Sequence, residues 1–240
     1  MKQVAAIIVA AGTGSRMGAQ ARSKQFLPLD GRPVLAHTLA RFESCAEIDE
    51  IVLVIQEEER DRCAQIIADV GAAKVSALVP GGEERQDSVW NGLQHLSPQT
   101  EIVLIHDAVR MFITSEILTR SIEYARQCGA SVVAVPANDT VKIVTSHQDG
   151  FFVERTLDRR QLWQVQTPQT FRYNLICDIH QQARSEGLSG TDDAMLLEHF
   201  GHPVKIVPGS YRNIKITTPD DLLIAEAFLR DERRQVNKNK

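Results

Sequence analysis

Short apolar runs alternate with amphipathic stretches through the first 136 residues of the chain. The runs are rich in Val, Ile and Leu, without regular polar alternation, which is typical of strands buried on both faces of a parallel sheet. We expect these strands at residues 4–10, 51–55, 74–79, 101–105 and 130–136. Between them, apolar residues recur at helical spacing, which predicts amphipathic helices. The helices are expected to begin at 32–35 and to span 57–70, 85–96 and 115–127, with Pro33 in a first turn and Ser115 as a cap.

Strands and helices that alternate in this way predict a doubly wound, mainly parallel α/β sheet. Such sheets bind ligands at the carboxyl ends of their strands. At 240 residues, the chain is long enough for one such domain of ordinary size but too short for two large ones. We therefore expect a single domain over residues 1–240.

The pattern changes after residue 137. Residues 140–145 and 151–156 read as two strands joined by a turn at 147–150, which predicts a β-hairpin arm over 138–158. A two-stranded arm is only marginally stable alone, so it either folds back on the sheet or reaches a second subunit, and we favour the second subunit. The remaining elements are expected to be helices at 172–186, 192–200 and 219–229, a strand at 204–207, and a flexible tail at 231–240.

The first strand ends in a glycine-rich segment, residues 10–18, which Lys24 follows. Its glycines permit a tight turn whose N–H groups can bind an anion, and Arg16 and Lys24 add positive charge. Such a segment can also be a simple turn. It is neither a Walker A loop, which ends in Gly-Lys-Ser/Thr, nor a G-x-G-x-x-G fingerprint, because Met17 stands where the third glycine belongs. A polyphosphate ligand on another nucleotide-binding fold is the favoured interpretation.

Composition excludes several classes of protein. The net charge is −4 and the pI is about 6.0, which gives no basic footprint for nucleic acid, so phosphate binding must be local. No apolar run is long enough to cross a membrane and no signal peptide is evident, so we expect a cytoplasmic protein without a membrane partner. The cysteines form no C-x-x-C pair, which argues against zinc and disulfides and favours small core residues. They are Cys45, Cys63, Cys128 and Cys177.

Charged residues recur where later strands end. Asp107 follows a buried strand, Arg85 and Arg110 lie close to strand ends, and Lys215 precedes the last helix. Asp107 could simply cap a turn, or it could hold Mg²⁺ beside a triphosphate, because magnesium takes few protein ligands and relies on phosphate oxygens. The histidines show no H-x-x-x-H spacing, and no G-x-S-x-G nucleophile elbow occurs. Acyl-enzyme chemistry is therefore not expected.

Motifs distributed over nearly the whole chain resemble those of the 2-C-methyl-D-erythritol 4-phosphate cytidylyltransferases, a family of the nucleotidyltransferase superfamily. The resemblance implies a Rossmann-like, mainly parallel sheet, a projecting arm that builds a homodimer, and transfer of CMP from CTP to 2-C-methyl-D-erythritol 4-phosphate. The motifs are Ala10-Ala-Gly-x-Gly-x-Arg-Met-Gly18, Lys24-Gln, Gly81-Gly-x-x-Arg85-x-x-Ser88-Val, His106-Asp-Ala-x-Arg110, Asp139-Thr-x-Lys142, Thr167-Pro-Gln169, Thr191-Asp192 and Asn213-Ile-Lys-Ile-Thr217.

The same resemblance implies roles for particular residues. The cytosine and ribose would be held by Ala10, Ala11, Gly12, Gly82, Glu83 and Ser88. Arg16, Lys24 and Lys215 would neutralise the reacting phosphates, and Asp107 would orient the site around Mg²⁺. The methylerythritol phosphate would be bound by Asp107, Arg110, Thr140, Arg159, Thr167, Thr191 and Lys215, with Thr140 and Arg159 reaching a neighbouring subunit.

One position departs from the family pattern: Met111 follows Arg110 where a proline is usual. Proline would fix the backbone φ angle, so its absence predicts a looser loop around Arg110. Two alternatives remain beside the main interpretation. The ribitol-5-phosphate cytidylyltransferases of teichoic acid synthesis resemble the chain less after residue 150, and a non-catalytic nucleotide-binding protein would not need Arg16, Lys24, Asp107 and Lys215 together.

Overall fold

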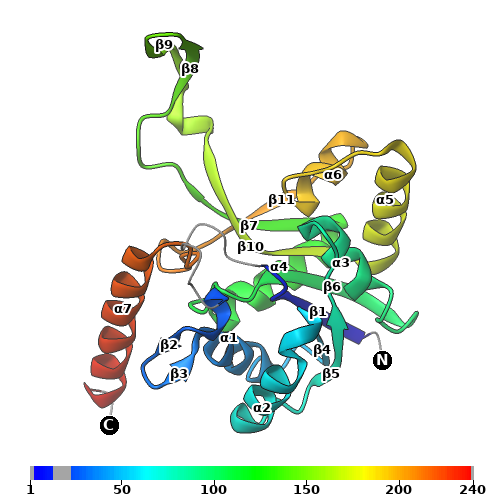
Figure 1. Cartoon of the computed structure of the whole chain (residues 1–240). Coiled ribbons are helices and arrows are strands. Elements are labelled where there is room, and N and C mark those ends of the chain that lie inside the picture. Colours follow the sequence, from blue (N-terminus) through cyan, green and yellow to red (C-terminus); the bar gives the residue numbers. More distant parts are fainter. Residues whose placement is uncertain (1–2, 13–22, 239–240) are drawn as a thin grey trace.

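The computed structural model describes residues 3–12 and 23–238, with side chains as far as Gln235. A seven-stranded sheet in the order β11-β7-β10-β6-β1-β4-β5 forms the centre (Figure 1). In chain order, its strands are β1 Gln3–Val9, β4 Glu50–Ile55, β5 Val75–Pro80, β6 Thr100–Asp107, β7 Ala130–Pro136, β10 Trp163–Arg172 and β11 Lys205–Pro208. Within this sheet, as far as the chain is described, β10 alone runs antiparallel to its neighbours. The predicted mainly parallel α/β sheet is confirmed.

Helices cover both faces of this sheet. Helices α1 (Val34–Glu43), α2 (Arg60–Val70) and α4 (Ser115–Cys128) share one apolar cluster with it. Helices α3 (Arg85–Leu93), α5 (Tyr173–Glu186) and α6 (Asp193–His199) share a second cluster on the other face. On β1, Ile8 belongs to the first cluster and Ile7 to the second, because neighbouring side chains of a strand point to opposite faces. Burial on both faces explains why the strand sequences are apolar throughout.

Strand β10 is the principal element that the sequence pattern did not predict. It lies between β6 and β7, and its register against β7 shifts between Val165 and Gln169, a segment that contains Pro168. Its buried residues include Gln166, Thr167 and Gln169, so the apolar run that marks the other strands is missing. Their polar groups are paired by hydrogen bonds to distant parts of the chain, which a local pattern cannot reveal.

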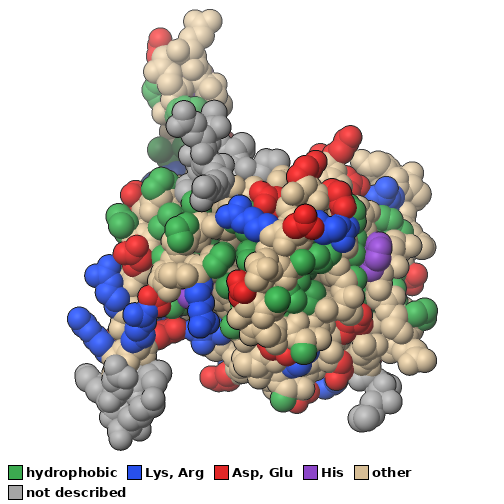
Figure 2. Space-filling view, turned by 60° about the horizontal axis from the view of Figure 1, so that its bottom comes forward, with side chains coloured by type: hydrophobic (Ala, Val, Ile, Leu, Met, Phe, Trp, Pro, Cys, Tyr) green, Lys and Arg blue, Asp and Glu red, His purple; other side chains and the backbone are tan. Residues whose placement is uncertain are grey.

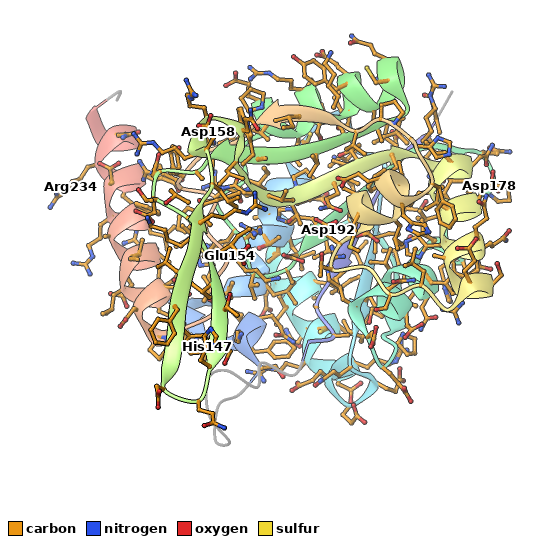
Figure 3. All side chains as sticks on the ribbon, turned by 90° about the horizontal axis from the view of Figure 1, so that it is seen from above. His147, Glu154, Asp158, Asp178, Asp192 and Arg234 are labelled. Carbon is orange, nitrogen blue, oxygen red and sulfur yellow. The ribbon has the colours of Figure 1, made fainter. Side chains whose placement is uncertain are left out.

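The arm consists of β8 (Lys142–His147) and β9 (Gly150–Thr156), which pair only with each other among the described residues. It stands clear of the body of the molecule in Figures 1 and 2. In Figure 3, His147 marks its tip, Glu154 its middle and Asp158 its base. Phe151, Phe152 and Val153 are 77%, 56% and 61% exposed, so within one chain the arm does not fold back on the sheet.

Several predicted element ends need correction. Arg32–Pro33 forms a short strand, β3, against β2 (Pro28–Leu29), so the first helix begins at Val34. Residues 57–59 are a 3₁₀ turn (η3, Glu57–Glu59) before α2, and α3 ends at Leu93 rather than at 96. The cap of α4 is Thr114, not Ser115, because its hydroxyl accepts from the N–H of Ile117. Cys128 is exposed, so the expectation that all four cysteines lie in the core is wrong for that residue.

The last helix, α7 (Pro219–Lys238), runs nine residues beyond its predicted end at residue 229 and includes most of the predicted flexible tail. A third apolar cluster joins α7 to β2 and to Met111 and Phe112. Figure 2 shows several Lys and Arg side chains along the side of the molecule that α7 forms. Ion pairs hold the helix beyond residue 230, which explains why this polar segment is helical. They are Arg212–Asp231, Arg41–Glu232 and Arg233–Asp30.

A truncation tests whether these pairs stabilise the fold. A chain ending at Arg230 loses all three pairs, whereas a chain ending at Gln235 keeps them. Each exposed pair contributes up to about 1 kcal/mol, so the shorter chain should be less stable by about 1–2 kcal/mol. Urea unfolding of the two chains measures the difference. Equal stability would mean that residues 231–235 contribute nothing to the fold.

Candidate active site

A cavity of about 670 Å³ opens at the carboxyl ends of the parallel strands. The last residues of four neighbouring strands line it: Val9, Ile55, Pro80 and Asp107. The loop after β1, the loop before α3 and the segment before α7 complete its wall. The cavity therefore lies at the edge where an open α/β sheet is expected to bind its ligand.

One wall of the cavity is a close-packed glycine turn. A Cβ at Gly81 would lie 2.3 Å from the Cβ of Ala11, and a Cβ at Gly82 would lie 2.2 Å from that of Asp87. No other residue therefore fits at either position without displacing the backbone. The N–H of Gly82 donates to Oγ of Ser88 (3.1 Å), and that hydroxyl donates to the carbonyl oxygen of Glu84 (3.1 Å). These contacts hold the glycine turn closely against the loop that follows β1.

Lys24 lines the same cavity from a short 3₁₀ turn, η2 (Lys24–Phe26). The neighbouring Gln25 is buried, and its amide donates to the carbonyl oxygen of Ala10 at the end of β1. Phe26 is buried in the core next to it. The two buried neighbours fix the turn to the sheet and so place Lys24 at the cavity.

Asp107 is the centre of charge in the site. Its Oδ2 lies 2.9 Å from Nζ of Lys215 and 3.5 Å from Nε of Arg110, and its Oδ1 lies 3.4 Å from Nε of Arg85. Burial alone would raise the pKa of Asp107, but the three cations outweigh burial and hold it well below its usual range. The carboxylate is therefore ionised, and one negative charge faces three positive ones.

Behind Asp107, a buried hydrogen-bond chain fixes the end of β6. Nε2 of His106 lies 3.0 Å from the carbonyl oxygen of Arg110, which places the proton on Nε2. Nδ1 then accepts from the hydroxyl of Thr167 (3.0 Å), and that hydroxyl accepts from the N–H of Asp107 (3.1 Å). Burial lowers the pKa of His106 to about 4, which agrees with the neutral form that this chain requires.

The expected role of Asp107 as a magnesium ligand stays a prediction. Both of its carboxylate oxygens contact cations, which a metal ion would have to displace. The described residues also contain no group of three or more His, Cys, Asp or Glu side chains that could hold a metal. The cations around it are suited to an anion such as phosphate.

The structure brings most of the expected site residues together. The cavity is lined by Ala10, Ala11, Gly12, Lys24, Gly82, Glu83, Ser88, Asp107 and Lys215. Thr167 and Arg110 lie behind it, in contact with Asp107. Thr140, Arg159 and Thr191 do not line the cavity of their own chain. Arg16 lies outside the described residues.

Sequence reasoning assigned no role in the site to four residues that the structure connects to Asp107. Arg85 lines the cavity and donates from Nη1 to Oδ2 of Asp193 (2.7 Å). Asp193 in turn contacts His180, and Gln169 accepts from its backbone N–H. Arg85 and Gln169 stood in quoted motifs, and polar residues at buried helix positions could have indicated His180 and Asp193. No periodicity separates them from surface residues.

The loop of Arg110 is anchored although Met111 replaces the usual proline. Met111 is buried in the cluster under α7, and Nη1 of Arg110 donates to the carbonyl oxygen of Asn213 (2.8 Å). The N–H of Arg110 also closes a turn on the carbonyl of Asp107. Packing and hydrogen bonds thus supply the restraint that proline would have given.

An open α/β sheet, with a nucleotide-sized cavity at its carboxyl edge, a close-packed glycine wall and a cluster of cations, defines a nucleotidyltransferase-like enzyme. The model of the family described as 2-C-methyl-D-erythritol 4-phosphate cytidylyltransferase matches residues 4–231. The chain belongs to this cytidylyltransferase family.

Relatives with that name agree over almost their whole length. The one from Pelotomaculum thermopropionicum is 49% identical over 231 residues, covering 96% of this chain and 95% of its own. The one from Geobacillus kaustophilus is 51% identical over 224 residues, covering 93% and 96%. The crystal structure of 4-diphosphocytidyl-2C-methyl-D-erythritol synthase from Anaerococcus prevotii is 35% identical, covers 95% of this chain and 96% of its own, and superposes with a TM-score of 0.83.

The buried His106 predicts a specific pH dependence of stability. Its pKa is about 6.5 unfolded and about 4 folded, so the unfolded state binds more protons between these values. Stability should therefore fall as the pH is lowered from 6.5 to 4, by up to about 1.4 kcal/mol per pH unit from this residue. Urea unfolding at several pH values measures the slope. His106→Gln should flatten it, and an unchanged slope would contradict the assignment.

Proposed function

We propose that the protein transfers CMP from CTP to 2-C-methyl-D-erythritol 4-phosphate, releasing pyrophosphate and 4-diphosphocytidyl-2-C-methyl-D-erythritol, in the non-mevalonate isoprenoid pathway. Membership of the family supports this reaction. The observation that carries it is the cavity at the sheet's carboxyl edge, which Lys24 and Lys215 line together with the glycine wall. A cytoplasmic location without nucleic-acid or membrane partners is part of the proposal. Among the described residues, no helix has the length and apolarity needed to cross a bilayer.

The nucleotide would lie against the glycine wall. The small side chains of Ala10, Ala11 and Ser88 leave room for a pyrimidine, and backbone groups of Gly12 and Gly82 with Glu83 can contact its edge and ribose. We expect this lining of small residues to favour a pyrimidine over the larger purine bases. Preference for CTP over ATP and GTP follows from this shape.

The reaction needs no activated nucleophile, because the substrate phosphate is already an anion. A phosphate oxygen attacks the α-phosphorus of CTP, and the bond to the β-phosphate oxygen breaks as pyrophosphate leaves with the electron pair. Both reactants are negative, so the protein must hold them in line and neutralise the charge. Lys24 and Arg16 would do so at the triphosphate, and Lys215 at the attacking phosphate.

Asp107 would act on the substrate side by fixing Lys215 and Arg110 against the incoming phosphate. Magnesium, the expected cofactor, would then accompany the triphosphate and be held chiefly by its oxygens, as this ion prefers in phosphoryl-transfer sites. When bound, magnesium supplies charge neutralisation at those oxygens. Thr167, in contact with the backbone of Asp107, would set the orientation of the carboxylate.

The substrate half of the site would be completed by a second subunit. Thr140 and Arg159 flank the arm and are exposed in a single chain, and Thr191 lies at the surface before α6. The apolar arm supplies the reason for association, because its exposed Phe and Val side chains need a partner surface. We propose a homodimer through the arm at 138–158, with Thr140 and Arg159 reaching the neighbour's site.

Pyrophosphate release tests the function directly. The purified protein, CTP and Mg²⁺ are incubated with 2-C-methyl-D-erythritol 4-phosphate or with ribitol 5-phosphate in parallel. The proposal expects rapid release with the first acceptor and little with the second. Equal or faster release with ribitol 5-phosphate would favour the teichoic acid branch, and no release with either would overturn both.

Replacing Lys24 tests the electrostatic role. The charge of Lys24 matters most when the α-phosphorus is crowded by negative oxygens, so Lys24→Ala should lower kcat by about a hundredfold or more. Lys205→Ala is the matched control, since Lys205 packs over Tyr124 away from the cavity. Near-normal turnover of Lys24→Ala in the pyrophosphate assay would contradict its role.

Mixed dimers test whether two chains build one site. Arg159→Ala and Lys24→Ala chains should each be inactive alone, but a mixed dimer contains one site with neither lesion and one with both. Random exchange makes half the dimers mixed, so activity should recover to about a quarter of wild type. Mass spectrometry confirms the exchange. Exchange without recovered activity would place both residues in one chain's site.

A further inference from the structure

A buried chain of charged and polar side chains connects the second face of the sheet to the cavity. Nε2 of His180 on α5 lies 3.1 Å from Oδ1 of Asp193, at the start of α6. The other oxygen of Asp193 accepts from Nη1 of Arg85 at 2.7 Å, and Nε of Arg85 lies 3.4 Å from Asp107. His180 and Asp193 are 0% and 1% exposed, so water cannot replace these contacts.

The backbone that carries Asp193 is itself fixed. Oε1 of Gln169 on β10 accepts from the N–H groups of Asp193 and Ala194, at 3.0 Å each. The amide of Gln169 donates to Asp192, which caps α6 through the N–H of Met195. Asp192 is labelled in Figure 3. These hydrogen bonds fix the backbone at Asp193, and they therefore restrict the positions that its carboxylate can take.

His180 is held with equal firmness. Its ring stacks on Trp90 of α3, with centroids 6.1 Å apart and planes 15° from parallel. Its Nε2–H must donate to Asp193, because a carboxylate only accepts. Among the described residues, Nδ1 has no hydrogen-bond partner. The ring thus makes one polar contact, and that contact is directed at Asp193.

The guanidinium of Arg85 is held by Asp193 and by Asp107. Two carboxylates hold its guanidinium from different sides, through Nη1 and Nε, and neither uses Nη2. The planar guanidinium is bound at two of its nitrogens, so it cannot rotate away from its partners as the single ammonium group of a lysine could. Burial would lower the pKa of Arg85, but Asp193 and Asp107 raise it, so the cation stays charged at the cavity wall.

We propose that Asp193, oriented by His180, is a positioning residue for catalysis: it holds Arg85 against Asp107 and so fixes the cations that face the reacting phosphates. This inference rests on the proposed CMP transfer. Neither His180 nor Asp193 lines the cavity, so both act through Arg85. Charges preorganised in this way stabilise the transition state more than the bound substrate, so their loss should appear in kcat rather than in KM for CTP.

The test begins with Asp193→Asn, which removes the charge and keeps the shape. The amide oxygen can still accept from Arg85, and its NH₂ can donate to Nε2 of His180 if the ring proton moves to the vacant Nδ1. Asp193→Asn should lower the single-turnover rate of CMP transfer about tenfold or more, with KM for CTP changed less than about threefold. His180→Gln keeps a donor and should retain most of the rate, whereas His180→Leu should lose it.

A double-mutant cycle separates positioning from a merely structural effect. If Asp193 acts only through Arg85, adding Asp193→Asn to Arg85→Gln should change the single-turnover rate by less than about twofold. If each substitution instead acted independently by loosening the fold, the rate losses of the two single variants would multiply in the double variant. Arg184→Gln is the matched control, because Arg184 also joins α5 to α3, through Asp87, but makes no contact with Arg85 or Asp107. It should leave the rate unchanged.

The outcomes are distinguishable. An inactive wild-type protein with CTP and 2-C-methyl-D-erythritol 4-phosphate would overturn the proposed function. An active wild type with multiplicative penalties in the cycle, or with wild-type rates for Asp193→Asn, would overturn the positioning role alone. A loss of rate in Arg184→Gln equal to that in Asp193→Asn would likewise show that helix packing, not Arg85, is responsible.

Discussion

The burial of one carboxylate, Asp107, determines the arrangement of the site. An isolated carboxylate withdrawn from water costs several kcal/mol, so a buried one must be paired. Its partners come from separate segments: Arg85 from α3, Arg110 from the turn after β6, and Lys215 from the segment before α7. Two of these cations, Arg85 and Lys215, also line the cavity. The pairing of the buried carboxylate therefore also places cations where an anion could bind.

The antiparallel strand β10 explains how the arm comes to lie beside that site. β7 ends at the carboxyl edge of the sheet, and because β10 runs the opposite way, it begins at the same edge. The arm connects these two ends, so Thr140 and Arg159 leave the sheet at the edge where the cavity opens. A parallel strand in the place of β10 would need a crossover to the opposite edge. The direction of one strand thus places both ends of the arm at the edge where the cavity opens.

The sequence predicts what local chemistry specifies and misses what distant pairing specifies. The apolar strands and most of the helices follow from periodicity, and the glycine wall from residues that permit close packing. Strand β10 is not predicted because its buried residues Gln166 and Gln169 are polar, and their hydrogen-bond partners lie more than twenty positions away in the sequence. The end of α7 is not predicted for the same reason, because its ion pairs are with Asp30 and Arg41, which are far away in the sequence. The sequence marks Asp107 as a site residue, but it does not show that Arg85, Arg110 and Lys215 all pair with its carboxylate.

Asp107 is a charged group buried in the protein, whereas the arm exposes apolar side chains to water. Its strands pair only with each other within the described chain, and its large apolar side chains face solvent. A two-stranded hairpin has too little buried surface to be stable alone, and an exposed apolar face of this kind favours association. In a twofold pair, the surface that receives an arm belongs to a chain that offers its own arm in return. Association would then bury both arms at once and carry Arg159 toward the neighbour's cavity, so the same contact that stabilises the arm would complete the substrate site.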